Sequence, residues 1–403
     1  MKRIQITCAS LLIISAILFG TVAHAEETLR PEVSKPMLAA QELIKSQKYR
    51  EALAKIRDAE AVPARTAYES FIIERMRATA AAGAGDTELA AKSFETLINS
   101  GKLPKADQLQ MIEALASTYY SAKNYTLANG WIQKYFKSGG TNPQMRTLFA
   151  QSLYLSGDYA AASKEITAIN ADAERAGGVP AENMLQLQAS CQNKAKDYAG
   201  YIATQERLIK HYPKMEYWAE MVSRVQSKPG FSDRLLLDIY RLRYAIGSLV
   251  EANAYQEYAQ LALQDGFPAE AKKIVNEGFD KKLLGAGANA SRHNRLRDLA
   301  NRQAGEDLAA LNKKSRVSDA NTQVNDGYDF VTHGEVEKGI NIMEKAIAKG
   351  GLKRPDDASL HLGMAYLQAG NKAKAAQALK TVLNSVNGVG DIAKLWMLQG
   401  GLE

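Results

Sequence analysis

A set of small and large apolar residues recurs after 34 positions between Gln110 and Asn170, and this repetition constrains the fold more than any other feature of the chain. The first copy consists of Ala116, Tyr119, Tyr125, Ala128, Ile132 and Tyr135, and the second of Ala150, Leu153, Tyr159, Ala162, Ile166 and Ile169. Small residues recur where two helices approach closely, and large apolar residues recur where a helical hairpin fills its core. A period of this length predicts stacked helix–turn–helix units.

Most of the chain can be placed in register with these two copies. The equivalent positions, separated by steps of 33 to 39 residues, are Ala40, Ala78, Ala116, Ala150, Ala189, Val222, Ala259, His293, Gly327 and Gly363. The register predicts about nine or ten helical pairs, of which those at Val222 and His293 match poorly. No stretch shows the strict alternation of a β-strand, so we predict an all-α fold.

The N-terminus has the features of a secretory signal peptide. Lys2 and Arg3 precede an apolar run without charge from Cys8 to Val22, and Ala23-His24-Ala25 is a small-x-small cleavage site. We expect cleavage after Ala25 and a periplasmic protein with no transmembrane segment after cleavage. The alternative is an uncleaved membrane anchor, for which the apolar run is short.

Charge and cysteine content narrow the classes of partner. The 403-residue chain has a net charge of +7, and removal of Lys2 and Arg3 leaves +5, which does not indicate nucleic acid as a partner. Cys191 is the one cysteine outside the predicted signal peptide, so no internal disulfide is expected there. We interpret it as a buried thiol, with a reactive or intermolecular thiol as the alternative.

The pattern divides the chain into five segments. They are a signal peptide (1–25), a flexible polar leader (26–36), an N-terminal repeat array (37–213), irregular and degenerate helices (214–320), and a C-terminal repeat pair with a capping helix (321–403).

Across nearly all of the mature chain, these markers resemble the tetratricopeptide repeat (TPR) family. The resemblance is strongest for the hairpins at Ala116, Ala150, Gly327 and Gly363. It implies a right-handed α-solenoid of about nine or ten TPR-like hairpins, in which the first helix of each hairpin lines a concave groove.

Carried across by register, the groove positions are mostly amides and tyrosines. Amides can bond both the N–H and the C=O of an extended peptide, and tyrosine adds apolar area with a polar tip. An exposed helix face rich in Gln is the alternative. The predicted groove residues are Gln110, Glu113, Ser117, Tyr120, Gln144, Gln151, Tyr154, Asn183, Gln186, Asn193, Asn253, Gln256 and Gln260.

The corresponding positions of the last two hairpins are mainly apolar. Either they clamp a helix or a hydrophobic motif, or the final segment at Ile392–Leu398 buries them. These positions are Val324, Tyr328, Val331, Leu360, Met364 and Leu367.

A basic patch lies in the irregular part of the array. Lys272 to Arg316 holds eleven Lys and Arg against five Asp and Glu. Such a surplus suits an acidic protein, an anionic lipid head group or an acidic glycan, and a solvated basic helix is the alternative. Its central residues are Arg292, Arg295, Arg302, Lys313 and Lys314.

No arrangement of residues indicates catalysis, a cofactor or a metal. The sequence lacks a His-Glu-x-x-His motif, a Gly-x-Ser-x-Gly elbow and a Walker-type phosphate loop. The histidines after residue 25 are far apart and are expected at the surface or at helix ends: His211, His293, His333 and His361. The lysine and asparagine pair of the TPR carboxylate clamp is not found in register.

The resemblance therefore implies a non-enzymatic periplasmic scaffold or adaptor that binds cell-envelope proteins through its groove. Related exported TPR proteins work with TonB-type energy transduction and with outer-membrane or polysaccharide assembly. A glycan- or peptidoglycan-associated binding protein, or the helical part of a cell-wall-acting system, is the alternative. A transglycosylase-like enzyme would need a further catalytic domain, for which the repeats, running almost to Glu403, leave no room.

Overall fold

The computed structural model describes residues 28–313 and 319–402 of the chain. The predicted signal peptide and Lys314 of the basic patch lie outside the described residues. Within them, twenty α-helices and two short 3-10 helices are present, and there is no β-strand. The predicted all-α class is confirmed. The chain divides into two compact units at residues 169 and 170, and each unit is described by itself.

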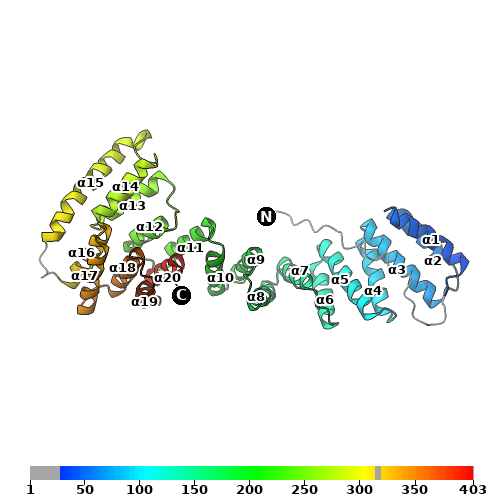
Figure 1. The fold of residues 1–403 in the computed structure, drawn as a ribbon. Helices are drawn as coiled ribbons and strands as arrows, with labels where there is room; N and C mark the ends of the chain where they lie inside the picture. Colours follow the sequence, from blue (N-terminus) through cyan, green and yellow to red (C-terminus); the bar gives the residue numbers. More distant parts are fainter. Residues whose placement is uncertain (1–27, 314–318, 403) are drawn as a thin grey trace. The chain divides into compact units, whose positions relative to one another are not determined.

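The first unit is a succession of helical hairpins (Figure 1). Helices within a hairpin pack on each other, and each hairpin packs on the next. Its helices are α1 (Pro31–Lys45), α2 (Tyr49–Glu60), α3 (Ala67–Ala84), α4 (Thr87–Asn99), α5 (Lys105–Ser121), α6 (Tyr125–Lys137), α7 (Pro143–Leu155) and most of α8 (Tyr159–Arg175).

Side chains at the helix starts fix where these helices begin. Thr66 and Glu69 form a reciprocal capping box at the start of α3, in which each side chain accepts a hydrogen bond from the other residue's backbone N–H. Asn124 accepts from the backbone N–H of Leu127 at 3.3 Å at the start of α6. These caps satisfy backbone donors that have no partner inside the helix.

The core of the first unit follows the predicted pattern of small and large residues. Ala116 of α5 and Ala128 and Ile132 of α6 have no exposed surface. The two alanines let the helices approach each other, and Ile132 fills the space beside them. The marker residues predicted from the 34-residue period therefore form the packed interior of the hairpin.

The polar leader is shorter than predicted, because α1 begins at Pro31 and includes Pro36. Proline is tolerated at the first helical position, where its missing N–H has no partner within the helix. Arg30, just before α1, donates from Nε to Glu69 at 2.8 Å and from Nη2 to the carbonyl of Ala64 at 3.1 Å. These contacts tie the start of the described chain to α3.

The second unit contains four further hairpins together with helices that do not pair in this way. The hairpins are α9 (Glu182–Lys194) with α10 (Tyr198–His211), α13 (Ala252–Gln264) with α14 (Pro268–Asp280), α16 (Ala320–Thr332) with α17 (Val336–Lys349), and α18 (Pro355–Gln368) with α19 (Lys372–Lys380). The other helices are α11 (Met215–Ser227), η2 (Asp233–Leu235), α12 (Leu236–Ala245), η3 (Gly287–Asn289), α15 (Ala290–Lys313) and α20 (Val389–Gly400).

The predicted domain boundary at residue 213 differs from the boundary between the units. Leu185 of α9 and Leu208 of α10 belong to one buried apolar cluster that continues to Met397 of α20. The fifth hairpin therefore shares its core with the C-terminal helices, although its sequence markers match those of the N-terminal array.

The two degenerate repeats are not hairpins. Helix α12 packs against α13 and α20 rather than against α11. The segment at His293 forms one long helix, α15, which packs on α13, α14 and α16. The poor match to the repeat pattern at these two places thus reflects real departures from hairpin geometry.

A buried set of charges holds α12 in place. The guanidinium of Arg241 donates to both carboxylate oxygens of Glu270 at 2.9 and 2.7 Å and to Asp238 at 2.8 Å. Asp238 also contacts Nε2 of His361 of α18 at 2.9 Å. Tyr258 donates its hydroxyl to Glu270 at 2.6 Å. These contacts join α12 to α13, α14 and α18.

The final helix closes the second unit. Helix α20 packs on α10, α12, α18 and α19. Figure 1 draws it in red, next to α18 and α19. Ile392, Ala393 and Leu395 on it are buried. The predicted capping segment therefore exists and covers helices from several hairpins.

Candidate functional site

The predicted polar face of the first unit lies on α5 and α7. Helical spacing places Glu113 and Tyr120 on one side of α5, and Gln151 and Tyr154 on one side of α7. In the 34-residue period Tyr154 is the equivalent of Tyr120, and Gln151 is the equivalent of Ser117. All four side chains are partly exposed, and Gln110 and Gln144 near the helix starts are fully exposed.

Hydrogen bonds join the two helices across this face. Tyr120 donates its hydroxyl to the amide oxygen of Gln151 at 3.4 Å. Asn142, which caps α7, donates its amide to Glu113 at 2.5 Å. The structure therefore brings together Tyr120 and Gln151 from two successive repeats, and it adds Asn142, a partner of Glu113 that the register did not single out.

An aromatic pair is repeated at each tyrosine of this face. The rings of Tyr120 and Tyr125 meet edge to face with centroids 5.6 Å apart, and those of Tyr154 and Tyr159 meet in the same way at 5.5 Å. Each hairpin turn thus holds its tyrosine in one orientation. Rigid aromatic side chains lose little conformational entropy on binding, which suits a recognition surface.

Partial burial raises the pKa values of two titratable groups of the face, Glu113 and Tyr120. Desolvation raises the pKa of Glu113, and the hydrogen bond from Asn142 opposes this rise. Burial likewise raises the pKa of Tyr120, and the neighbouring Tyr125 adds to the rise. Tyr120 therefore remains a neutral hydroxyl at neutral pH, able to donate or accept a hydrogen bond.

Two shallow pockets of the first unit lie away from this face. One is lined by the start of α2 and by Gly83 and Ala84, and the other by Arg50, Arg57 and the α3–α4 turn. Neither pocket is lined by residues of α5 or α7, and the α5–α7 face is a polar surface that spans two hairpins.

In the second unit, α9 carries an exposed polar face of the same kind. Asn183, Gln186 and Asn193 are all exposed. Gln186 donates its amide to the hydroxyl of Tyr217 on α11 at 2.6 Å, and Tyr217 donates to Glu182 at 2.5 Å. Lys214 forms an ion pair with Glu182 at 2.6 Å.

Sequence reasoning missed three members of this network, namely Glu182, Lys214 and Tyr217. Burial and the hydrogen bond to Glu182 raise the pKa of Tyr217 to about 12. The register offered one usable signal: Tyr217 lies on the same helix as Val222, the marker of the sixth repeat.

The remaining predicted positions are less accessible. Asn253 on α13 is exposed, whereas Gln256 is buried and its amide donates to Gln260 at 3.4 Å. The apolar positions of the last two hairpins are buried except for Leu367, which is partly exposed. The buried positions are Val324, Tyr328, Val331, Leu360 and Met364.

Two helices cover parts of this apolar region. The guanidinium of Arg241 on α12 lies over the ring of Tyr328, 4.6 Å from its centroid. Gly400 of α20 lies so close to Leu367 that a Cβ on the glycine would come within 2.7 Å of that side chain. Helix α20 therefore covers Leu367 only in part, and α12 covers Tyr328.

The predicted basic patch lies along α15. Arg292, Arg295, Arg302 and Lys313 are all exposed. Their spacing places Arg295, Arg302 and Lys313 on the side of the helix opposite to its buried residues, and Arg292 on its flank. The buried residues are His293, Leu296, Ala300, Ala304 and Leu311.

The histidines are expected at the surface or at helix ends, and two of them make internal contacts. His293 is in the first turn of α15 but is buried, and its Nδ1 accepts a hydrogen bond from the backbone N–H of Gly285 at 3.1 Å. His361 contacts the buried Asp238. Burial alone would raise the pKa of Asp238, but His361 and Arg241 lower it to about 2.

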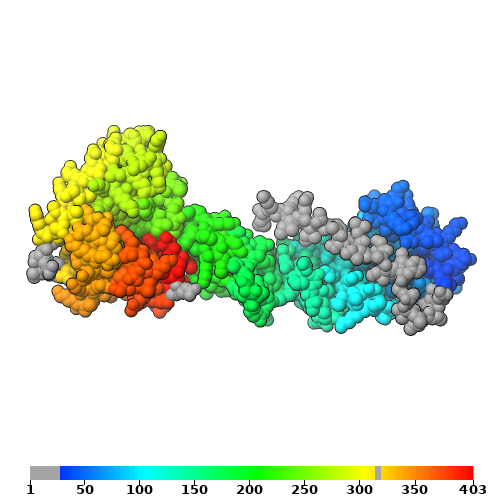
Figure 2. All heavy atoms as spheres, viewed as in Figure 1, coloured from blue at the N-terminus to red at the C-terminus, as the bar shows by residue number. Residues whose placement is uncertain are grey.

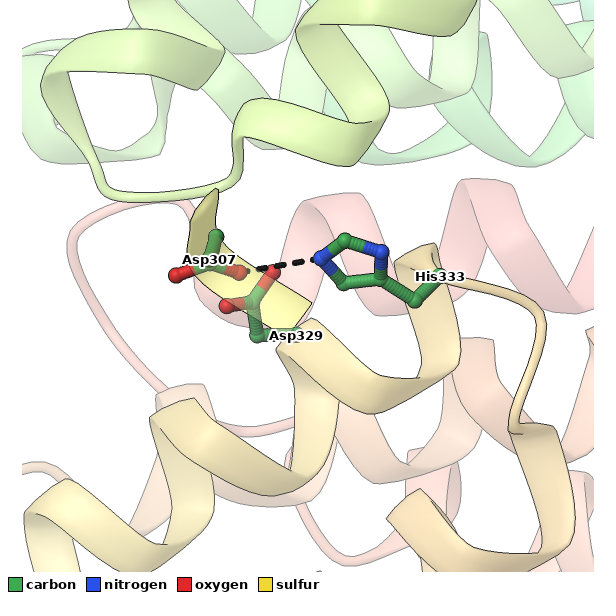
Figure 3. Close-up of side chains that lie close together, drawn as sticks. All are labelled: Asp307, Asp329 and His333. Carbon is green, nitrogen blue, oxygen red and sulfur yellow. Dashed lines mark hydrogen bonds and ion pairs between the residues drawn. The ribbon is translucent and has the colours of Figure 1, made fainter. Parts of the chain in front are cut away.

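One group of side chains could hold a metal ion by its composition. Asp307 of α15, Asp329 of α16 and His333 at the end of α16 point toward one another (Figure 3), with one potential ligand atom of each within 4.8 Å of the others. His333 Nε2 contacts Asp307 at 2.9 Å, and Thr332 donates its hydroxyl to Asp329 at 3.1 Å. The contact between His333 and Asp307 joins the end of α16 to α15, whereas the bond between Thr332 and Asp329 lies within α16.

Cys191 is buried in α9, as expected. Burial raises the pKa of its thiol to about 11. The thiolate is the nucleophilic form, so this cysteine is unreactive near neutral pH in the folded chain.

Among the described residues, no helix combines the length and the apolar character needed to cross a membrane.

Comparisons with known proteins support the repeat assignment. Residues 325–387, which include α17 and α18, match the family model described as Tetratricopeptide repeat. No curated protein sequence gives a significant match.

Two solved structures among those that match this chain are remote likenesses of it. A chain of Naa15/Naa10 bound to HypK-THB is 14% identical with a TM-score of 0.34, and the alignment covers 88% of this chain and 58% of that chain. The P58(IPK) TPR domain is 14% identical with a TM-score of 0.22, and the alignment covers 91% of this chain and 98% of that domain. Scores this low carry no information on partners.

Proposed function

We propose that this chain, of which residues 325–387 match the family model described as Tetratricopeptide repeat, is a non-enzymatic scaffold that binds a partner protein through the polar face of α5 and α7. The observation that carries the proposal is the repeated arrangement of Tyr120, Gln151 and Tyr154 on two successive hairpins. An array of packed helices presents such a face before binding, which lowers the cost of ordering it.

The chemistry of the face fits an extended protein segment. The hydroxyl of Tyr120 donates to the oxygen of the Gln151 amide, which leaves the two amide N–H groups as donors. Glu113 supplies a carboxylate whose pKa is raised by burial. Backbone carbonyls of a partner would accept from the amide, and the tyrosine rings would cover its apolar side chains.

We further propose that the protein acts in the periplasm on partners of the cell envelope. The support is the pattern of Lys2, Arg3, the apolar run and Ala23-His24-Ala25. Cell fractionation and N-terminal sequencing test this proposal. The expected mature chain begins at Glu26 in the periplasmic fraction, and an intact Met1 in another fraction contradicts it.

The binding face is tested by cross-linking the full chain in cell envelopes and identifying the captured proteins. The variant carries Tyr120→Ala, Gln151→Ala and Tyr154→Ala. We expect loss of one dominant protein partner, because three side chains of the face are removed while the buried markers of both hairpins remain.

A matched control carries Leu127→Ala, Gln133→Ala and Lys137→Ala, all exposed on the second helix of the same hairpin. This control should retain the partner. An unchanged partner list in the first variant moves the binding surface elsewhere, and degradation of peptidoglycan by the purified chain contradicts the non-enzymatic part of the proposal.

A further inference from the structure

Helix α15 has an outer face that no other described element covers. Its inner side packs on α13, α14 and α16. Figure 1 draws it as the long yellow helix of the second unit, and Figure 2 shows yellow atoms at the surface. The outer face consists of the exposed residues Arg292, Arg295, Asp298, Arg302, Gly305, Glu306, Ala309 and Lys313.

The arginines of this face are not used inside the described structure. Within residues 28–313 and 319–402, no hydrogen bond or ion pair engages Arg292, Arg295 or Arg302. Arg297, on the flank of the same helix, differs: its guanidinium lies 4.0 Å from the centroid of Phe279 and donates to Asn294 at 3.2 Å. The outer arginines therefore present all their donors to solvent or to a partner.

A glycine in the middle of this face has no structural purpose within the described chain. Gly305 lies inside α15, and a Cβ placed on it would meet nothing within 4 Å. Glycine in a helix interior costs about 1 kcal/mol relative to alanine. Ala309 follows one turn later. Because Gly305 and Ala309 have small side chains or none, the backbone of another helix can approach this part of the face closely.

We propose that the outer face of α15 docks an acidic α-helix of a partner protein. This inference rests on the proposed scaffold function and assigns a second contact surface to it. The planar fork of arginine matches the two oxygens of a carboxylate, and the small residues at the centre of the face let a helix lie against α15.

The charge pattern favours a protein helix over a uniform polyanion. Asp298 and Glu306 interrupt the arginines on the same face. A sulfated glycan or an anionic membrane would meet these carboxylates with like charge, whereas a partner helix can place a lysine or arginine opposite them. The face also carries no exposed large apolar side chain of the kind that inserts into a membrane.

A photo-cross-linking amino acid at Ala309 of the full chain tests the proposal. Irradiation in cell envelopes, followed by mass spectrometry of the linked peptide, should place the adduct in an acidic helical segment. Arg295→Glu with Arg302→Glu should lower the yield of that adduct by roughly tenfold, because close charge pairs become repulsive. Reversing two glutamates of the linked segment to arginine should restore the yield.

The controls separate charge, shape and the first binding face. Lys272→Glu with Lys345→Glu makes the same change of net charge at exposed lysines outside α15 and should leave the adduct intact. Gly305→Leu should lower its yield while the melting temperature of the chain is unchanged or higher. The alanine variant of Tyr120, Gln151 and Tyr154 tests the α5–α7 face separately, because it leaves α15 unchanged.

Several results overturn the proposal. They are an adduct in a segment without excess acidic residues, an adduct that survives both α15 variants, or binding of heparin or anionic-lipid vesicles to the purified chain that depends on Arg295 and Arg302. If the α15 variants fail to change the adduct while the α5–α7 variant loses its partner, the scaffold function stands and the α15 surface does not.

Discussion

At the scale of single residues, the charged side chains of this protein are placed to join helices to one another. Glu69 accepts from Arg30 in the segment before α1 and from the backbone of Thr66 at the start of its own helix. Arg241 joins α12 to α14 through Glu270. In both cases a carboxylate that would be costly to bury alone is matched by a guanidinium.

The Glu69 contacts predict sensitivity to acid. Hydrogen bonds from Arg30 and from Thr66 lower the pKa of Glu69 from an ordinary value of 4.5 to about 2. A carboxyl with a lowered folded pKa contributes stability above its unfolded pKa and loses it as the pH falls through the folded value. The stability advantage of the wild type over Glu69→Gln should therefore be full at pH 6 and shrink as the pH falls from about 4.5 toward 2.

Denaturant unfolding at a series of pH values measures this difference. Glu42→Gln is the matched control, because Glu42 is exposed and pairs only with Lys45 one turn away. Its difference from the wild type should be small throughout. A difference for Glu69→Gln that does not depend on pH would show that the Arg30 contact does not stabilise the folded chain.

At the scale of elements, glycine sets how closely helices can pack. A Cβ on Gly327 of α16 would come within 2.9 Å of the carbonyl oxygen of Gly339 on α17 and 2.6 Å of Met343. The two helices thus meet backbone to backbone. Gly327 is a marker of the repeat pattern in the sequence, and the structure shows the close approach that requires a glycine there and at Gly339.

Two alanine substitutions should therefore have opposite effects. Gly339→Ala places a methyl group against the backbone of α16, so we expect a loss of at least about 1–3 kcal/mol in the free energy of unfolding. Gly305→Ala meets open space in α15 and should gain up to about 1 kcal/mol. Chemical denaturation measures both, and a stable Gly339→Ala variant would contradict the close approach.

The sequence predicts elements well where the contacts are local. The pattern of Ala116, Ala128 and Ile132 identifies hairpins because both helices of a pair lie within one period. The pattern does not reveal that α12 packs on helices other than α11, because the partners of α12 include His361, which is 123 residues from Asp238 in the sequence. Likewise, the register predicts that Tyr120 and Gln151 share one face. It does not predict the hydrogen bond between Tyr217 and Glu182.

At the scale of the whole molecule, the described chain contains two separate apolar cores. One runs from Val33 to Met145 and the other from Leu185 to Met397. The 34-residue period does not indicate this division, because the markers of the hairpin at Ala189 resemble those on its N-terminal side. The division comes from packing between residues far apart in sequence.

Each core should therefore respond to its own substitutions. Ile132→Ala removes a fully buried side chain of the first core and should cost about 2–5 kcal/mol. Arg241→Ala removes the guanidinium that pairs with the buried carboxylates of Asp238 and Glu270 in the second unit, and should cost roughly 3–5 kcal/mol.

Hydrogen exchange followed by mass spectrometry separates the two effects. Ile132→Ala should speed exchange in α5 and α6 but not in α12 to α14, and Arg241→Ala should do the reverse. Faster exchange in both regions for either variant would mean that the two cores unfold as one.

The position of α12 also has a consequence for the time at which the chain can finish folding. Arg234 and Asp238 meet Asp357 and His361, and Lys228 meets Asp391, so these partners are synthesised 123 to 163 residues later. At ~5–20 residues per second, a ribosome needs roughly 6 to 30 seconds to add them. During that interval Leu235, Ile239 and Leu242 lack part of their final cover. The later helices α18 and α20 therefore complete the packing around α12.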